Sequence, residues 1–402
     1  MSQNKLGELG TDRDLCRDSV PPQKSQGPLS GLRIVEIASL APAPFGCMLL
    51  ADLGADVLRV DRLNSRPTFS GPAGPLDRGR RSVALDLKSP QGVAAVGRLI
   101  RDADVLIEGF RPGVAERLGI GPDAMLEINP RLIYGRMTGW GQEGPLAARA
   151  GHDINYVSIS GALEPIGTAG EKPHPALNLL GDFAGGGSFL ALGILSALYE
   201  RERSGKGQVI DAAMVDGSSV LMSFIHGMRT AGLWEGERGT NLLDGGASFY
   251  GTYETSDGKY MAVGCIEPQF YSQLLEKMGI TAGVAGEQMD PSRWPETKDL
   301  FSRIFKEKTR SEWTEIFFNS DACVTPVLSP WEAHLHPHNQ IRSAFVDVGG
   351  VMQPAPAPRF SRSSPASPVP MDAGGRNPSE TLAHWGLNPA EIQDLVSRGA
   401  VG

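Results

Sequence analysis

The feature that most constrains the fold is an alternation of short β-branched runs with helical stretches in the first half of the chain. Parallel strands need a long crossover connection between them, usually a helix, and such alternation is typical of a doubly wound α/β fold. The sequence therefore predicts a parallel sheet with helices on both faces. We expect strands at residues 32–38, 56–60, 82–87, 104–110, 131–137 and 208–211.

Helices are expected between these strands. One of them has Ser89 as N-cap and Pro90 at its first position, a combination typical of helix starts. We expect helices at residues 45–53, 90–101, 183–202 and 214–231.

The second half of the chain has a different texture and predicts a second domain. Short strand-like runs and turns between 239 and 327 indicate a smaller α+β domain, and 328–339 reads as a linker. Residues 340–402 are expected to complete a large domain that begins at 27 and runs to 232. Within them, the Pro/Ser-rich stretch 353–370 predicts an extended strap. Residues 1–26 are polar and are expected to form a disordered leader.

Composition excludes several classes of protein. The net charge of −8 argues against a general nucleic-acid binder. The four cysteines are far apart and form no C-x-x-C pair, which favours a reducing compartment and no structural zinc. No run of about eighteen apolar residues is present, so no membrane span is expected. We therefore expect a cytoplasmic protein.

The loop after the first strand is not that of a dinucleotide-binding site. Residues 39–44 lack the G-x-G-x-x-G pattern that brings a backbone close to a pyrophosphate, so NAD or FAD is not expected. The same letters occur at 139–144, but too far from the first β-α-β unit, and we interpret them as a loop. Arg62 at the end of the second strand favours a phosphate ligand.

Three ionisable residues stand in separate Gly- or Pro-flanked segments. His152 lies in GHDINY, Asp182 in LLGDF and Glu267 in CIEPQF. Singly, each has an ordinary explanation, because such residues are often turn residues or helix caps. Together, two bases of different pKa and an orienting carboxylate fit proton abstraction next to a carbonyl group.

The surroundings of Asp182 suit that chemistry. We expect Asp182 to cap the helix predicted at 183, with free backbone N–H groups beside it that receive an oxyanion. Residues 185–187 are all glycine, which would let a ligand approach the first turn closely. Three methionines either pack in the core or form an adaptable floor for an apolar chain. They are Met214, Met222 and Met228.

From about residue 27 to about 361 the chain resembles the α-methylacyl-CoA racemases of the family III CoA-transferase superfamily. The stretches that carry the resemblance are long and need almost no gaps. They are GLRIVEIASLAPAPFGCMLLADLGADVLRVDR, DVLIEGFRPGVAERLGIGP, RLIYGRMTGWGQEGPLAARAGHDINY, LNLLGDFAGGGS, SGKGQVIDAAMVDGS and AVGCIEPQFY.

The superfamily implies one of two chemistries. In its transferases the residue matching Asp182 attacks a thioester and forms an acyl anhydride, whereas in its racemases it accepts and donates a proton. His152 and Glu267 match the racemase pattern, and residues 243–247 lack the longer glycine run of the transferases. Racemase is therefore favoured, with CoA-transferase as the alternative and a non-catalytic binder of CoA thioesters as a third possibility.

The resemblance also implies an architecture and a set of ligand contacts. It implies a Rossmann-like large domain and a small domain in an interlocked homodimer, with Glu267 approaching His152 from the other subunit. The substrate is an acyl-CoA, and neither metal nor redox cofactor is expected. An excess of Arg and Lys over acids between 78 and 117 agrees with CoA binding. The implied contacts are Arg62, Arg111 and Arg117 on the phosphates, Leu85 and Leu87 beside the adenine, and Asp153 and Tyr156 around the thioester.

Overall fold

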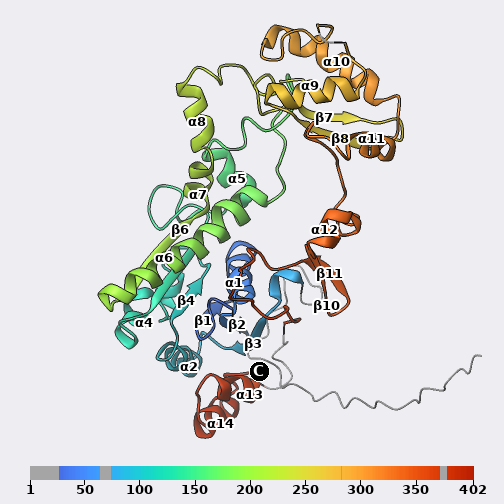
Figure 1. Cartoon of the computed structure of the whole chain (residues 1–402). Helices are drawn as coiled ribbons and strands as arrows, with labels where there is room; N and C mark the ends of the chain where they lie inside the picture. The colour runs from blue at the N-terminus through green and yellow to red at the C-terminus, as the bar shows by residue number, and fades with distance from the viewer. Residues whose placement is uncertain (1–26, 64–73, 282, 372–377) are drawn as a thin grey trace, which may run out of the picture.

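A computed structural model describes residues 27–63, 74–281, 283–371 and 378–402, so the predicted leader 1–26 lies outside the described residues. The central element is a six-stranded sheet in which every pair is parallel, in the order β3-β2-β1-β4-β5-β6 (Figure 1). This order confirms the predicted doubly wound α/β fold. The strands are β1 (Arg33–Ile37), β2 (Asp56–Arg62), β3 (Arg80–Leu85), β4 (Val105–Glu108), β5 (Ile133–Thr138) and β6 (Gln208–Ala213).

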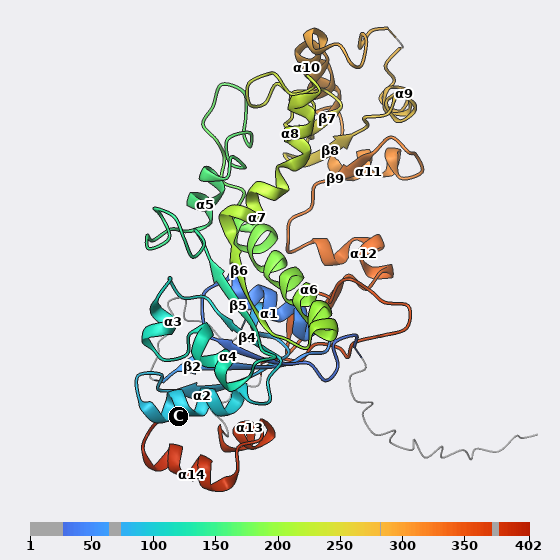
Figure 2. The same ribbon diagram turned by 90° about the vertical axis from the view of Figure 1, so that its left-hand side faces the viewer.

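Helices cover both faces of this sheet because successive strand residues point to opposite sides. In β1, Ile34 packs in one core with α1 and α6, and Val35 packs in the other with α2, α4, α13 and α14. Figure 2 shows the C-terminal helices below the sheet and α6 above it. The helices of this part are α1 (Pro42–Asp52), α2 (Pro90–Ile100), α3 (Val114–Arg117), α4 (Pro122–Ile128), α5 (Asp153–Ile159), α6 (Phe189–Ser204), α7 (Met214–Leu221), α8 (Ser223–Thr230), α13 (Pro378–His384) and α14 (Pro389–Ser397).

The helix expected at 183–202 begins earlier, with a π-helix at Leu179–Ser188 that continues into α6. Its three glycines serve packing, contrary to the expected approach of a ligand. A Cβ on Gly185 would lie 2.6 Å from the backbone nitrogen of Ser218 in α7, and one on Gly187 would lie 2.4 Å from the carbonyl oxygen of Pro42 in α1. The glycines are therefore required where two other helices cross the π-helix at backbone distance.

The π-helix and α6 together form one long apolar helix. Among the described residues, Leu179–Ser204 is one helix that is long and apolar enough to cross a membrane, which the expectation of no span did not foresee. It packs on β5, β6 and α1, as the core helix of an α/β sheet does. The helix expected at 214–231 is likewise different, because it is divided into α7 and α8 at Met222.

The small domain is an antiparallel sheet with helices on it, at the top of Figure 1. It has its own aromatic core, in which Tyr253 stacks on Phe305 with ring centroids 5.1 Å apart. The strands are β7 (Tyr250–Glu254), β8 (Tyr260–Gly264) and β9 (Val324–Pro326), and the helices are α9 (Pro268–Lys277), α10 (Trp294–Phe305) and α11 (Arg310–Phe317). Short 3₁₀ turns occur at Pro75–Asp77, Pro291–Arg293 and Ala333–Leu335.

The chain then returns to the large sheet through α12 (Pro337–Ile341) and the hairpin of β10 (Phe345–Val348) and β11 (Val351–Pro354). A buried arginine links this hairpin to α1. Arg78 pairs with Asp52 at 2.5 and 3.0 Å and donates to the side chain of Gln353 at 3.0 Å. At the far end, Val401 forms a β-bridge with Leu85. The last segment of the chain is thus part of the structure around the large sheet.

Candidate active site

A cavity of about 410 Å³ lies at the carboxyl ends of β1, β4 and β5. Its wall includes Ala38 just after β1, Gly109 just after β4 and Thr138 at the end of β5. The strand order reverses between β1 and β4, and such a switch point leaves a crevice in which α/β proteins bind ligands. The topology of the sheet therefore positions this cavity.

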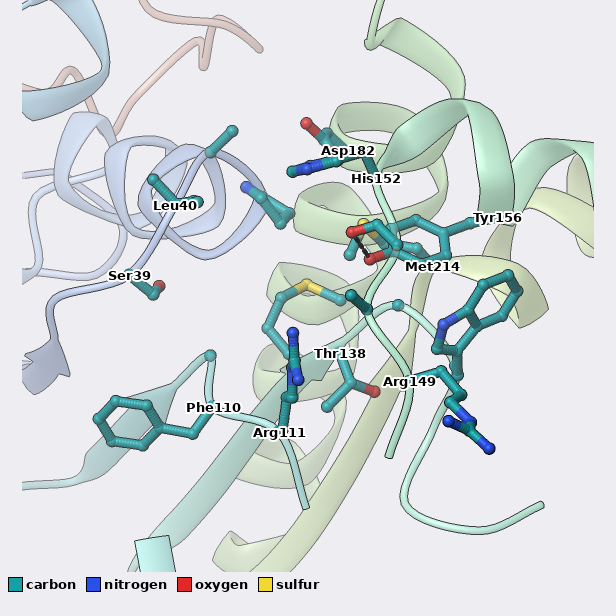
Figure 3. A pocket seen from close by; sticks show the side chains of 18 of the residues that line it. Ser39, Leu40, Phe110, Arg111, Thr138, Arg149, His152, Tyr156, Asp182 and Met214 are labelled. Carbon is teal, nitrogen blue, oxygen red and sulfur yellow. Dashed lines mark hydrogen bonds between the residues drawn. The ribbon is translucent and has the colours of Figure 1, made fainter. Parts of the chain in front are cut away.

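His152 and Asp182 both line this cavity, although 30 positions separate them in the sequence. Figure 3 shows the two side chains together at one end of it. His152 is the N-cap residue of α5, where its backbone N–H donates to the side chain of Asn155 at 3.0 Å. Asp182 is half-buried in the first turn of the π-helix. The fold thus brings an imidazole and a carboxyl group to one end of the cavity.

Asp153 has a different place from the one expected. Its buried carboxylate accepts the backbone N–H groups of Gly181 at 2.6 Å and Asp182 at 2.7 Å. Asp182 is consequently not the cap of its helix, because Asp153 supplies a capping oxygen from another element. The two amides are thus occupied and are not the free N–H groups that we expected beside Asp182 for an oxyanion. The side chain of Asp153 holds the backbone of the π-helix and does not face the cavity as a thioester ligand.

Tyr156 forms part of the cavity wall. Its hydroxyl donates to the carbonyl oxygen of Gly151, and its ring meets Trp140 edge-on at a centroid distance of 4.7 Å. A Cβ on Gly139 would lie 2.1 Å from this ring, which explains the first glycine of the loop at 139–144. Because the hydroxyl has a protein partner, Tyr156 is not free to bind the thioester as expected.

The environment of Asp182 raises the pKa of its carboxyl group. Burial is the largest cause, and the nearby Asp153 carboxylate acts in the same direction. Asn178 opposes them, because its side-chain amide donates to Asp182 Oδ2 at 3.1 Å, and His152 also lowers the pKa. Asp182 therefore keeps a proton at higher pH than an ordinary aspartate. Sequence reasoning missed Asn178, because the helix was expected to begin only at 183 and Asn178 flanks the start of the π-helix at Leu179.

Glu267 does not line the cavity of its own chain. It is the exposed N-cap residue of α9 in the small domain. The loop before it is fixed by Gln288, whose side-chain amide donates to the carbonyl oxygens of Cys265 at 2.9 Å and Ile266 at 2.8 Å. Glu267 thus follows a loop held by hydrogen bonds, and within the single chain it lies outside the cavity that His152 and Asp182 line.

The residues implied for CoA binding are spread over several places. Arg111 lines the cavity with His152. Arg117 and Leu87 line a second pocket of about 630 Å³ at the start of α2. Arg62 is exposed at the end of β2 and lines neither pocket. Leu85 is fully buried in the core of the sheet, so the expectation that its side chain lies beside an adenine is wrong.

The three methionines do not form the single floor of the cavity that we considered. Met214 lines the cavity, whereas Met222 is half-buried and Met228 is buried, and neither lines it. The cavity also contains Arg149, an exposed residue that sequence reasoning did not single out. In the part of the chain that the structure describes, no group of three His, Cys, Asp or Glu side chains could hold a metal ion.

The sequence and the fold are those of a known protein family. The chain belongs to CoA-transferase family III, whose model matches residues 29–374. It is 49% identical over 371 residues to the alpha-methylacyl-CoA racemase of Mus musculus, covering 92% of this chain and 96% of that one. Its identity with the racemase of Homo sapiens is 48% over 371 residues, with the same coverage. A solved CAIB/BAIF family protein from Brucella suis superposes with a TM-score of 0.76 at 26% identity, covering 89% of this chain and 99% of that one.

Proposed function

We propose that the chain is an α-methylacyl-CoA racemase that interconverts (2R)- and (2S)-2-methylacyl-CoA thioesters by proton transfer through an enolate. The observation that carries the proposal is that His152 and Asp182 share one end of the cavity. The names of the mammalian relatives, similar over nearly their whole length, support it. The chain would thus be an isomerase.

The proposed reaction moves one proton onto each face of one carbon. Neutral His152 removes the α-proton from one face, and the electron pair of the broken C–H bond passes into the enolate. Protonated Asp182 then delivers its proton to the opposite face, and the reverse reaction exchanges the two roles. The raised pKa of Asp182 supports the role of donor, because more of it is protonated near neutral pH. Inversion requires two groups, because the proton must arrive on the face opposite to the one it left.

The enolate oxygen needs a hydrogen-bond donor close to this pair. The amides of Gly181 and Asp182 are engaged by Asp153. The backbone N–H of Asp153 follows His152 directly, and it has no acceptor among the described residues. We assign this N–H to the enolate oxygen. No redox group or metal takes part in this scheme.

We further propose that the active site is completed in a homodimer by Glu267 of the partner subunit, which would orient His152. Two features support this. Glu267 is exposed on an ordered loop outside the cavity of its own chain. Large apolar side chains are also exposed on both connections between the domains, as expected for surfaces that a partner covers. They include Phe224 at 66%, Trp331 at 84% and Ile341 at 86% exposure.

For the CoA part of the substrate we propose Arg111 and Arg117 as phosphate ligands, with Arg62 at the edge of the site. Leu87 in the pocket at the start of α2 would contact the adenine. Met214 is the methionine placed to contact the acyl chain. We also propose that the enzyme needs no added cofactor and that it works in the cytoplasm.

The experiment is hydrogen exchange in deuterated water with each epimer of a 2-methylacyl-CoA. Wild type should exchange the Cα hydrogen of both epimers at comparable rates. His152→Gln and Asp182→Asn should each lose racemisation by a factor of about 10² to 10⁴. Each variant should still exchange the epimer whose proton faces the base that remains. Exchange from neither epimer by wild type would refute the racemase.

CoA transfer is the alternative within this family. It would use Asp182 as a nucleophile, and the carboxylate would form an anhydride with the acyl group and release CoA. Hydroxylamine would then trap an acyl group on wild type, and turnover would need a free acid as acceptor. We expect neither result. A non-catalytic binder would bind acyl-CoA without exchange or transfer.

A further inference from the structure

We propose that Arg149 is a phosphate ligand of CoA, a second guanidinium that acts with Arg111 at the end of the cavity away from His152 and Asp182. The inference rests on the proposed function for its substrate class, a CoA thioester. It adds a specificity residue that neither the sequence pattern nor the resemblance assigned.

Arg149 has a defined place in the cavity wall. It closes a turn in which its backbone N–H donates to the carbonyl oxygen of Leu146 at 2.7 Å. Its side chain is exposed, and within the described ranges no carboxylate lies within 4.0 Å of its guanidinium or of that of Arg111. Two guanidiniums in one cavity thus keep their full hydrogen-bonding capacity for a ligand.

The charge balance of the cavity favours an anion. Among the described lining residues, Asp182 is the acid, whereas Arg111 and Arg149 are permanently positive. Asp182 is a poor ion-pair partner, because its raised pKa keeps part of it neutral. Other arginines of the chain are neutralised locally, such as Arg310, which pairs with Glu332. The cavity therefore has unbalanced positive charge.

The two arginines and the proton-transfer pair occupy different parts of the cavity. Figure 3 shows Asp182 and His152 at one end of the cavity and the two arginines on either side of Thr138, towards the other end. The pantetheine arm separates the thioester from the phosphates, so a reacting carbon beside His152 puts the phosphates away from it. Planar guanidinium forks match phosphate oxygens in charge and in geometry.

The first test measures affinity and needs no turnover. The variants are Arg149→Ala, Arg149→Lys and, as a control, Arg303→Ala in α10, an exposed arginine outside the cavity. Titration calorimetry is performed with CoA and with pantetheine, which lacks the phosphates. Arg149→Ala should weaken CoA binding about five- to tenfold, the size expected for an exposed charge-assisted contact. Arg149→Lys should lose less, and the control should match wild type.

Pantetheine should bind the alanine variant and wild type equally. Unchanged CoA affinity in Arg149→Ala, or an equal loss with pantetheine, would overturn the proposal. A loss of affinity seen only for acyl-CoA esters with a free carboxylate on the acyl chain would also overturn the proposal, because Arg149 would then recognise the acyl group and not the phosphates.

The second test follows racemisation of a 2-methylacyl-CoA and of the matching acyl-pantetheine. Arg149→Ala should raise KM for the CoA ester about five- to tenfold with kcat nearly unchanged, and it should leave the pantetheine ester unaffected. A fall in kcat with both esters would contradict a phosphate contact. The two proposals can be refuted separately. If Arg149→Ala loses CoA affinity but wild type exchanges no proton, the racemase proposal is refuted and the role of Arg149 in CoA binding stands.

Discussion

The side chain of Asp153 accepts the backbone N–H of Asp182 at 2.7 Å, so the residue next to one proposed base fixes the other. His152 and Asp153 are neighbours at the start of α5, and Asp182 belongs to the π-helix. A hydrogen bond between the two elements therefore sets the separation of the two proton-transfer groups. Such positioning is a large part of catalysis when a proton must travel to one defined carbon.

Replacing Asp153 should consequently affect turnover more than binding. Asp153→Ala removes the acceptor of two amides, and we expect kcat to fall about 10²-fold with KM changed less than threefold. Asp153→Asn keeps one carbonyl oxygen and should retain more activity than the alanine variant. Steady-state kinetics with both epimers checks this. Equal kcat in Asp153→Ala and wild type would contradict the positioning role.

Asn178 should control the pH dependence. Its amide donates to Asp182 Oδ2 at 3.1 Å and lowers the pKa of a carboxyl group that burial raises. Without that donor the carboxylate is less stable, so its pKa rises. His152 and Asp182 must share one proton, and the doubly protonated, inactive pair then persists to higher pH. The other ionisable groups near Asp182 are Asp153 and Tyr156, and both stay in place.

For Asn178→Ala we therefore expect the acid limb of the kcat/KM profile to move to higher pH, with a smaller change in the alkaline limb. Ser158→Ala on the exposed side of α5 is the control and should leave the profile unchanged. A merely structural role for Asn178 would lower activity at every pH without moving the acid limb. That result would show that the amide does not tune Asp182.

Gly185 should tolerate no side chain. A Cβ there would lie 2.6 Å from the backbone nitrogen of Ser218, so α7 and the π-helix would have to separate. We expect Gly185→Ala to destabilise the protein by about 1–3 kcal/mol, the usual range for overpacking, and to lower activity because Asp182 is on the same helix. Gly251→Ala in β7 is the matched control, since among the described residues Gly251 has no neighbouring heavy atom within 4 Å of its Cβ position. Denaturant unfolding should show no loss there, because glycine is itself unfavourable inside a strand.

The ion pair of Arg78 and Asp52 should be sensitive to loss of one partner. Both side chains are less than 5% exposed, so Asp52→Ala leaves an unpaired buried charge and should cost about 3–5 kcal/mol. The double variant Asp52→Leu with Arg78→Met removes both charges and should cost clearly less. Arg398→Ala breaks a pair exposed at 54% and 52% and should change stability by less than about 0.5 kcal/mol. Thermal or denaturant unfolding ranks the three, and the opposite order would contradict the prediction.

The sequence was sufficient for the sheet because each strand is a short β-branched run between clear helical stretches. The third strand lies at Arg80–Leu85 instead of 82–87, because the carbonyl oxygen of Asp86 accepts the N–H of Ser89 and turns the chain towards α2. The hairpin of β10 and β11 was not predicted. The end of β11 falls in the Pro/Ser-rich stretch from 353, which we interpreted as an extended strap without a strand partner.

At the site, the residue types were predictable and their partners were not. His152 and Asp182 were found from the combination of bases in Gly-flanked segments. The start of the helix that contains Asp182 was misplaced, since its capping oxygen comes from Asp153 and not from a neighbouring residue. The burial of Leu85 could not be predicted for a similar reason, because its core cluster includes side chains of the distant C-terminal segment, which also pairs with Leu85 through Val401.

That pairing has a practical consequence for anyone preparing the protein. The N–H of Gly402 donates to the carbonyl oxygen of Ala84, and Leu63 lies against the same glycine. A purification tag or fluorescent reporter fused at this end would emerge directly from the margin of the main sheet.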